Sequence, residues 1–252
     1  MRNFVKDNSI IREIWGKSDT VLLIFAGAAA EFALNKAVDW LYFTGKLPAD
    51  PLGRLFSTVT YARKIIFADK ATALQSIDSI YYIHKAVEHS RESTIPDWAY
   101  RDVLFMLIHY SIASFEVLER KLTAEEKEEV YNVFFRVGER MHLKDLAPDY
   151  KSWLIQREDH LADDLEKSKY TKDLFKQYKK HLGSTRYFFL IEGQKLIIPD
   201  RVRILLGLSK ISLLSFILPF YKLSRLVNLD ILIKKLLLPT EYETEIKEID
   251  IA

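Results

Sequence analysis

The chain has 252 residues, 49% of them hydrophobic, which is enough for one large domain with a buried core. Its 37 Lys and Arg residues nearly balance 35 Asp and Glu residues, so the net charge is only +2 and no nucleic-acid partner is expected. The chain has no cysteine, which excludes disulfides, thiolate zinc sites, iron–sulfur clusters and thiolate-ligated haem. A metal would therefore need imidazole or carboxylate ligands.

The N-terminal segment carries Lys6 and Asp7 where a secretion signal would need an uninterrupted apolar run, so we expect a cytoplasmic protein. The apolar stretch 21–30 is followed by Glu31 and Lys36 and is too short to cross a bilayer. It is typical of a buried helix.

Glycine and proline are sparse, with 8 and 7 residues, and the intervals between them favour helices. Asp50 before Pro51, and Thr123 with Glu126, are typical of helix starts. Segment 187–198 is compatible with a hairpin or a helix, and we favour the helix. The sequence thus predicts an all-α fold. The other predicted helices cover residues 8–16, 20–44, 51–67, 69–90, 97–120, 123–143, 149–167, 169–182, 200–208, 210–221 and 225–237.

His84 lies on an apolar face of the predicted helix 69–90, in line with Ala73, Ile77, Ile80 and Val87. An imidazole in that position is either a core side chain that bonds to a neighbouring carbonyl or a ligand of iron. His109, within the bulky segment 105–110, is either a packed histidine, a second ligand or part of a pocket wall.

Arg54 and Thr58 are four residues apart, so they share one helix face, with Tyr61 one turn further on. These polar side chains either anchor the helix or bind a haem propionate or iron-bound dioxygen. A di-iron centre is a weaker alternative, because its Glu-x-x-His motif occurs only once, at Glu139 and His142.

Five segments, taken in chain order, resemble the catalytic domain shared by latex-clearing proteins and MpaB-type oxygenases. They cover most of the chain up to about Leu208. The segments are Trp15-Gly16, 50–61 (Asp-Pro-Leu-Gly-Arg-Leu-Phe-Ser-Thr-Val-Thr-Tyr), 83–87 (Ile-His-Lys-Ala-Val), 98–109 and 198–208.

The resemblance implies a single helical domain related in packing to globins around a haem b pocket, and oxidation of an isoprenoid-like, apolar molecule with dioxygen. It places the iron ligand at His84 and the family's catalytic and haem-binding arginine and threonine at Arg54 and Thr58. We add His109 as a candidate pocket residue. Ser57 stands where latex-clearing proteins have a lysine that reaches the iron.

The first hypothesis is therefore a haem-dependent oxygenase or oxidoreductase. Because the lysine is absent, a haem or lipid carrier without catalysis is the second hypothesis. A helical protein without a cofactor is the third hypothesis. No carboxylate has a secure place as the general base; Asp39 and Glu31 are nearby acids.

We divide the chain into a lead-in helix (1–19), the catalytic domain (20–208), apolar and basic helices (209–238) and an acidic tail (239–252). Residues 204–221 are mostly apolar but are interrupted by Pro219, so they do not form a membrane span. The helices after residue 208 either pack on the core or form a peripheral membrane contact. Their interspersed basic residues are Lys222, Arg225, Lys234 and Lys235.

Overall fold

The computed structural model describes residues 3–45 and 49–225. Within these ranges the chain forms eleven helices and no strand, which confirms an all-α fold in a single domain. The globin-like packing stays a prediction. The helices are α1 Ile10–Trp15, α2 Ser18–Phe32, α3 Asp39–Phe43, α5 Pro51–Phe67, α6 Lys70–Arg91, α7 Asp97–Leu118, α8 Ala124–Arg140, α9 Tyr150–Asp163, α10 Lys169–Ile197, α11 Asp200–Leu206 and α12 Leu214–Arg225.

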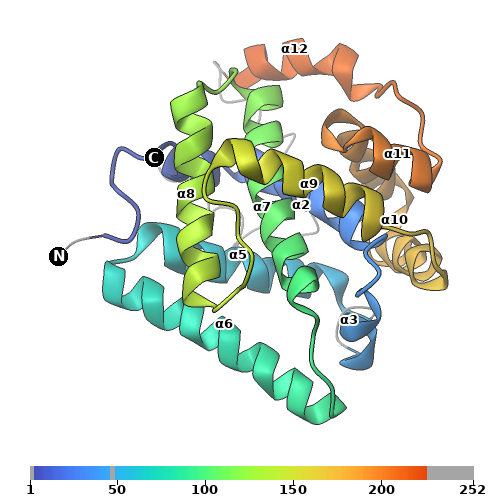
Figure 1. Cartoon of the computed structure of the whole chain (residues 1–252). Helices are drawn as coiled ribbons and strands as arrows, with labels where there is room; N and C mark the ends of the chain where they lie inside the picture. Colours follow the sequence, from blue (N-terminus) through green and yellow to red (C-terminus); the bar gives the residue numbers. More distant parts are fainter. Residues whose placement is uncertain (1–2, 46–48, 226–252) are drawn as a thin grey trace.

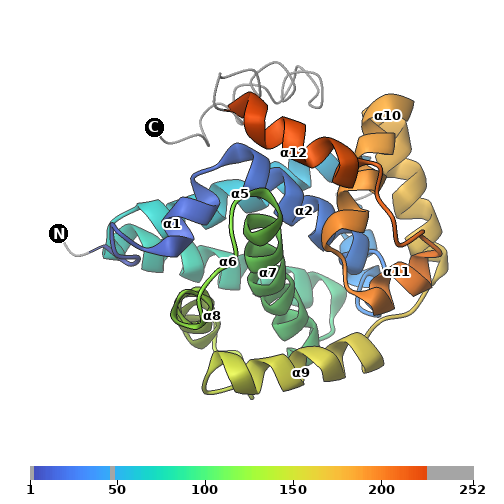
Figure 2. The same cartoon turned by 90° about the horizontal axis from the view of Figure 1, so that it is seen from above.

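Helices α2 and α7 pack against each other at the centre of the molecule (Figures 1 and 2). Helix α6 lies along one side of the molecule and α12 along the opposite side (Figure 1). Helices α8 and α9 cover another side, which faces the viewer in Figure 1. The main core lies where α1, α2, α7 and α8 meet. There the Trp15 ring packs edge-on against Phe25 at 6.1 Å and its indole N–H donates to Ser111 at 3.0 Å.

The capping signals in the sequence act as expected. The Asp50 carboxylate accepts a hydrogen bond from the Gly53 amide at 2.8 Å, with Pro51 as the first residue of α5. Thr123 and Glu126 form a reciprocal capping box at the start of α8. Each cap satisfies an amide that the helix itself leaves without a partner, which is why these starts were predictable.

The predicted helix 20–44 is wrong in its middle, because the chain turns between α2 and α3. The Asn35 side chain donates to the Asp102 carboxylate and accepts from the Ala37 amide, each at 2.8 Å. The Lys36 amide donates to the Asp164 carbonyl at 2.9 Å. These contacts to α7 and to the end of α9 replace the helical hydrogen bonds.

Residues 169–197 form one long helix, α10, with a kink at Gly183, so the hairpin alternative for 187–198 is wrong and the helix is confirmed. Gly183 has φ 72° and ψ 172°, which a residue without a side chain adopts at little cost. The predicted helix 210–221 begins and ends later, as α12.

The predicted helix 225–237 and the acidic tail 239–252 lie outside the described residues, except for Arg225. No described helix has the length and apolar character needed to cross a membrane.

The crossing of α2 and α7 depends on Gly27. A Cβ atom at this position would overlap the Tyr110 ring and would lie 2.7 Å from the Ile197 side chain. Gly193 on α10 is also buried within a helix, but a Cβ there would meet only Leu23, at an ordinary 3.5 Å. Both glycines therefore lie in helices, but only Gly193 has room for a Cβ atom.

We expect Gly27→Ala to destabilise the fold by about 1–3 kcal/mol, because overpacking outweighs the gain in helix propensity. Gly193→Ala is the matched control and should be neutral or stabilising by up to about 1 kcal/mol. Urea unfolding followed by circular dichroism measures both. Equal effects of the two substitutions would contradict a close crossing at Gly27.

Candidate functional site

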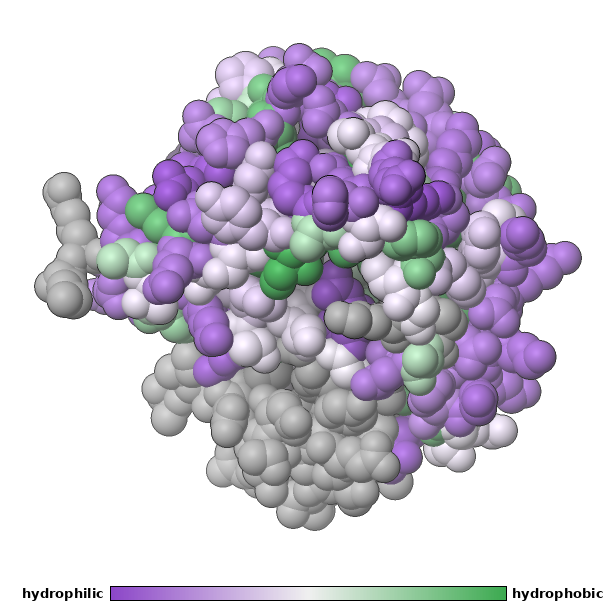
Figure 3. Space-filling model, turned by 90° about the horizontal axis from the view of Figure 1, so that it is seen from below, coloured by the Kyte–Doolittle hydropathy of each residue, from purple (hydrophilic) through white to green (hydrophobic). Residues whose placement is uncertain are grey.

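An apolar cavity of about 530 Å³ lies between α2, α5, α6, α7, α10 and α12. Its volume is within the range of small-molecule and cofactor sites, about 300–1,000 Å³. Most lining residues are apolar, among them Ala26, Ala29, Met106, Leu107 and Phe189. The outer face in Figure 3 contrasts with this lining, because hydrophilic residues cover much of its described part. Hydrophobic residues on this face gather near its centre, beside a hollow.

His84 of α6 lines this cavity as a neutral imidazole. Its Nδ1 atom lies 2.8 Å from the Ile80 carbonyl oxygen, so Nδ1 carries the proton and Nε2 keeps a free lone pair. Burial, with a smaller contribution from the positive charge of Arg54, lowers the pKa of His84 below its usual value. The side chain is therefore in the form that binds a metal ion.

Tyr100 of α7 holds the His84 ring in place. The two rings meet edge to face with centroids 5.2 Å apart. The Tyr100 hydroxyl donates to the Glu88 carboxylate at 3.1 Å, and the same carboxylate accepts the Ile95 amide at 3.0 Å. The Tyr100 ring is thus fixed at both ends, which limits rotation of the imidazole.

Two arginines line the same cavity, Arg54 from α5 and Arg186 from α10, and neither forms an ion pair among the described residues. Burial lowers the pKa of Arg54. The Nε atom of Arg186 is buried and has no hydrogen-bond partner in residues 3–45 and 49–225. Thr58 lines the cavity beside Arg54, and its hydroxyl donates to the Arg54 carbonyl at 3.1 Å. Two guanidinium groups in an apolar cavity are suited to an anionic ligand.

The structure brings His84, Arg54 and Thr58 together but places His109 elsewhere. His109 does not line the cavity. Burial and the charge of Arg157 lower its pKa to about 4, so its ring is neutral. Its Nε2 atom has no hydrogen-bond partner within the described part of the chain. Ser57 is exposed and is likewise not a lining residue.

The carboxylates that were considered as general bases also lie outside the cavity. Asp39 forms an ion pair with Arg91 at 2.6 Å. Asp19 does line the cavity, but its carboxylate already accepts the Tyr221 hydroxyl at 3.0 Å and lies 3.7 Å from Arg225. A free carboxylate base is thus absent among the described lining residues.

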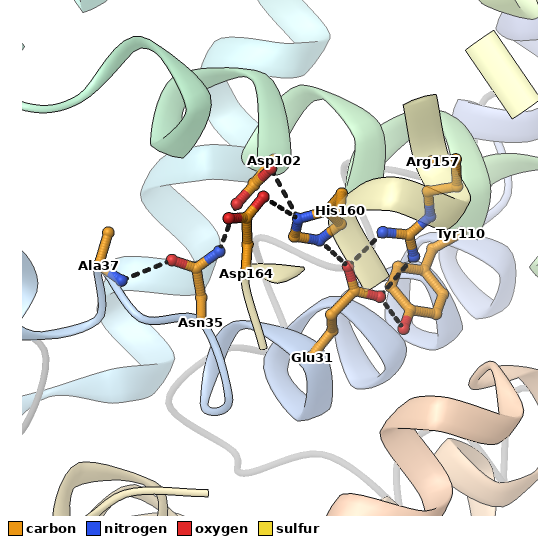
Figure 4. Close-up of polar contacts among 8 residues, drawn as sticks. All are labelled: Glu31, Asn35, Ala37, Asp102, Tyr110, Arg157, His160 and Asp164. Atoms are coloured by element: carbon orange, nitrogen blue, oxygen red, sulfur yellow. Dashed lines mark hydrogen bonds and ion pairs between the residues drawn. The ribbon is translucent and has the colours of Figure 1, made fainter. Parts of the chain in front are cut away.

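Glu31 belongs to a buried polar network that the sequence analysis missed (Figure 4). The Arg157 guanidinium donates to both Glu31 oxygens at 2.5 Å, and the Tyr110 hydroxyl donates to one of them at 2.8 Å. His160 Nε2 lies 3.0 Å from the other oxygen. Glu31 has no exposed surface, so its carboxylate loses all contact with water when the chain folds. These hydrogen bonds and ion pairs take the place of that water.

The network continues from His160 to the wall of the cavity. His160 Nδ1 lies 2.7 Å from the Asp102 carboxylate, whose second oxygen accepts from Asn35. Asn35 also lines the cavity. The sequence contained one signal for this network, the spacing of Arg157 and His160 on one helix face, but it did not indicate which acid they contact.

Electrostatics keep this network charged. Burial alone would raise the pKa of Glu31, but Arg157 and His160 outweigh it and hold that pKa well below the usual range. Burial would lower the pKa of His160, yet its contacts with Asp102 and Glu31 raise it to about 9. Burial raises the pKa of Asp102. At neutral pH, Glu31, Arg157 and His160 therefore form a charged cluster.

Comparison with protein families shows the family of the chain. Residues 14–227 match the family described as "ER-bound oxygenase mpaB/B'/Rubber oxygenase, catalytic domain", which confirms the resemblance seen in the sequence. The chain belongs to this family. No curated protein and no solved structure matches it.

We expect Glu31→Gln to destabilise the fold by about 3–5 kcal/mol, because it leaves the Arg157 charge buried without its partner. The double variant Glu31→Gln/Arg157→Met should cost less than the sum of the two single substitutions. Asp78→Asn, which removes an exposed ion pair with Arg140, is the control and should have a much smaller effect. Denaturant unfolding measures all four variants, and additive single effects would contradict the coupling.

Proposed function

We propose that the chain is a haem-dependent oxygenase or oxidoreductase that acts on an apolar, isoprenoid-like molecule with dioxygen. The observation that carries the proposal is one cavity that combines a neutral histidine, an apolar wall and two arginines without an ion pair to any described residue. Membership of an oxygenase family supports the same class of reaction.

The side chains of the cavity suit haem b. Nε2 of His84 would hold the iron, because Nδ1 is already bonded to the Ile80 carbonyl. Arg54 and Arg186 would bind the two propionates, since each lacks a carboxylate partner among the described residues. When bound, the haem would supply the redox chemistry with dioxygen.

The chain's own residues would bind the substrate, orient His84 and shield the site from water. The apolar walls would bind a hydrocarbon substrate and exclude water, which strengthens every electrostatic interaction inside. Tyr100 would keep His84 in one orientation. Arg54 would offer hydrogen bonds to negative charge. Thr58, whose hydroxyl donates to the Arg54 carbonyl, would line the site beside it, while the exposed Ser57 provides no cation.

A carrier without catalysis is the second candidate. The observations that favour it are the exposed Ser57 in place of a lysine and the absence of a free carboxylate among the described lining residues. Oxygen consumption with isoprenoid substrates distinguishes the two candidates. Haem uptake without oxygen consumption would favour the carrier, and no uptake of haem would favour a protein without a cofactor.

We further propose that α12 forms a peripheral membrane contact through which an apolar substrate reaches the cavity. Phe216 and Phe220 on α12 are 68% and 73% exposed, while Leu214 and Leu218 on the same helix line the cavity. One helix therefore separates the cavity from an apolar outer surface. The words "ER-bound" in the family's description are consistent with such a contact.

The contact would be mainly apolar rather than electrostatic. Arg225 forms an ion pair with Glu119 at 2.6 Å, and the Lys222 ammonium donates to the Glu119 carbonyl at 3.5 Å. These two cations are thus engaged within the protein. Membrane binding through α12 should depend weakly on salt.

We expect His84→Ala to abolish stoichiometric haem binding while the helical content stays, because the variant removes one ligand and no core contact. The measurement is Soret absorbance and iron content after expression with a haem precursor. His89→Ala, at an exposed position of the same helix, is the control and should bind haem normally. Full haem occupancy in His84→Ala would remove this residue from the site.

We expect the protein to co-sediment with phospholipid vesicles, and Phe216→Ser/Phe220→Ser to weaken this by at least about tenfold, since each buried Phe contributes about 1.5–3 kcal/mol. Phe188→Ser, an exposed aromatic on α10, is the control and should bind like the wild type. Binding that is unchanged in the double variant would reject α12 as the contact.

A further inference from the structure

A second pocket, of about 330 Å³, lies apart from the apolar cavity, between α7 and the C-terminal end of α9. Asp102 of α7, His160 of α9 and Asp164, which caps α9, line it together. We propose that these three side chains form a binding site for a divalent transition-metal ion, with Zn²⁺ as the best match. This inference does not depend on the proposed haem site.

The three ligand atoms already converge (Figure 4). Nδ1 of His160 lies 2.7 Å from an Asp102 oxygen and 3.4 Å from an Asp164 oxygen, and all three atoms lie within 4.8 Å of one another. His160 and Asp164 are four residues apart at the end of one helix, while Asp102 comes from a different helix. Small side-chain shifts would bring the three atoms to a common ion.

Partners outside this set hold the ligands in the orientation that a metal requires. His160 Nε2 lies 3.0 Å from Glu31, which Arg157 fixes in the core. A metal-binding histidine commonly uses its second nitrogen in this way, to donate to a carboxylate. The second oxygen of Asp102 accepts from Asn35 at 2.8 Å, so Asp102 is also fixed.

The surroundings favour a cation. Asp159 and Asp163 line the same pocket, and the C-terminal end of α9 contributes the negative end of its helix dipole. Arg101 also lines the pocket, but its guanidinium pairs with Asp145 at 3.3 Å. The Lys36 ammonium donates to the Asp163 carbonyl rather than to a proposed ligand.

The ligand set indicates the class of metal. One imidazole with two carboxylates suits zinc and related transition metals better than magnesium, which prefers oxygen ligands and bound water. On binding, the ion would take the Nδ1 lone pair and the Nδ1 proton would leave to solvent. Three protein ligands leave one position for water, and the ion would join α7 to the end of α9.

The test uses the untagged full-length protein as purified, treated with a chelator and then dialysed. Isothermal titration with Zn²⁺ should show one site per chain with a Kd below about 100 µM. Asp164→Asn should weaken Zn²⁺ binding by at least about tenfold. Loss of a residue that only hydrogen-bonds to a metal ligand already lowers metal affinity by about tenfold or more, and loss of a ligand should cost at least as much. Asp164 is partly exposed, so this substitution spares the buried core.

Asp163→Asn is the matched control, because it removes an exposed carboxylate from the same pocket without removing a proposed ligand. It should change Zn²⁺ affinity much less than Asp164→Asn. Co²⁺ substitution should give visible absorption bands in the wild type that Asp164→Asn loses. Failure to bind Zn²⁺, or equal losses in the two variants, would overturn the site and leave His160 as a partner of Asp102 and Glu31 only.

Discussion

The contacts of Glu31 with Arg157 and Tyr110 join three helices, and two of these, α2 and α7, also line the apolar cavity. Glu31 is on α2, Arg157 and His160 are on α9, and Tyr110, which also donates to Glu31, is on α7. Because the pair is fully buried, removal of Glu31 leaves the Arg157 charge without hydration or its carboxylate partner, whereas removal of Arg157 leaves Glu31 with only Tyr110 and His160. Such a pair stabilises one relative placement of the helices much more than any other.

That placement also shapes the apolar cavity. α2 and α7 supply much of its wall, and Asn35 both bonds to Asp102 in the network and lines the cavity. The network and the cavity thus share helices α2 and α7, although the network is charged and the cavity is apolar. Among the residues that the structure describes, Arg54 and Arg186 bring positive charge without an ion pair to the apolar side, where low polarity strengthens attraction to an anionic group.

The two histidine-containing regions illustrate how partners decide a histidine's role. The hydrogen-bond partner of His84 is a backbone carbonyl, so its ring stays neutral and Nε2 keeps its lone pair. His160 lies between carboxylates on both sides, which favour its protonated form in the absence of a metal. On the helix face of His84 lie Ile80 and Val87, whereas Arg157 and Asp164 flank His160, but the sequence does not specify which distant side chains complete either environment.

The sequence by itself determined most of the helices and several of their starts, because caps such as Asp50 and Thr123 act within four residues. It also indicated Arg54, Thr58 and His84 through a recognisable motif order. Only the tertiary structure decided the break after α2, the Glu31 network and the second arginine of the cavity, Arg186. Those features join residues far apart in the chain, such as Glu31 and Arg157, and no local spacing specifies which distant side chains meet once the helices pack.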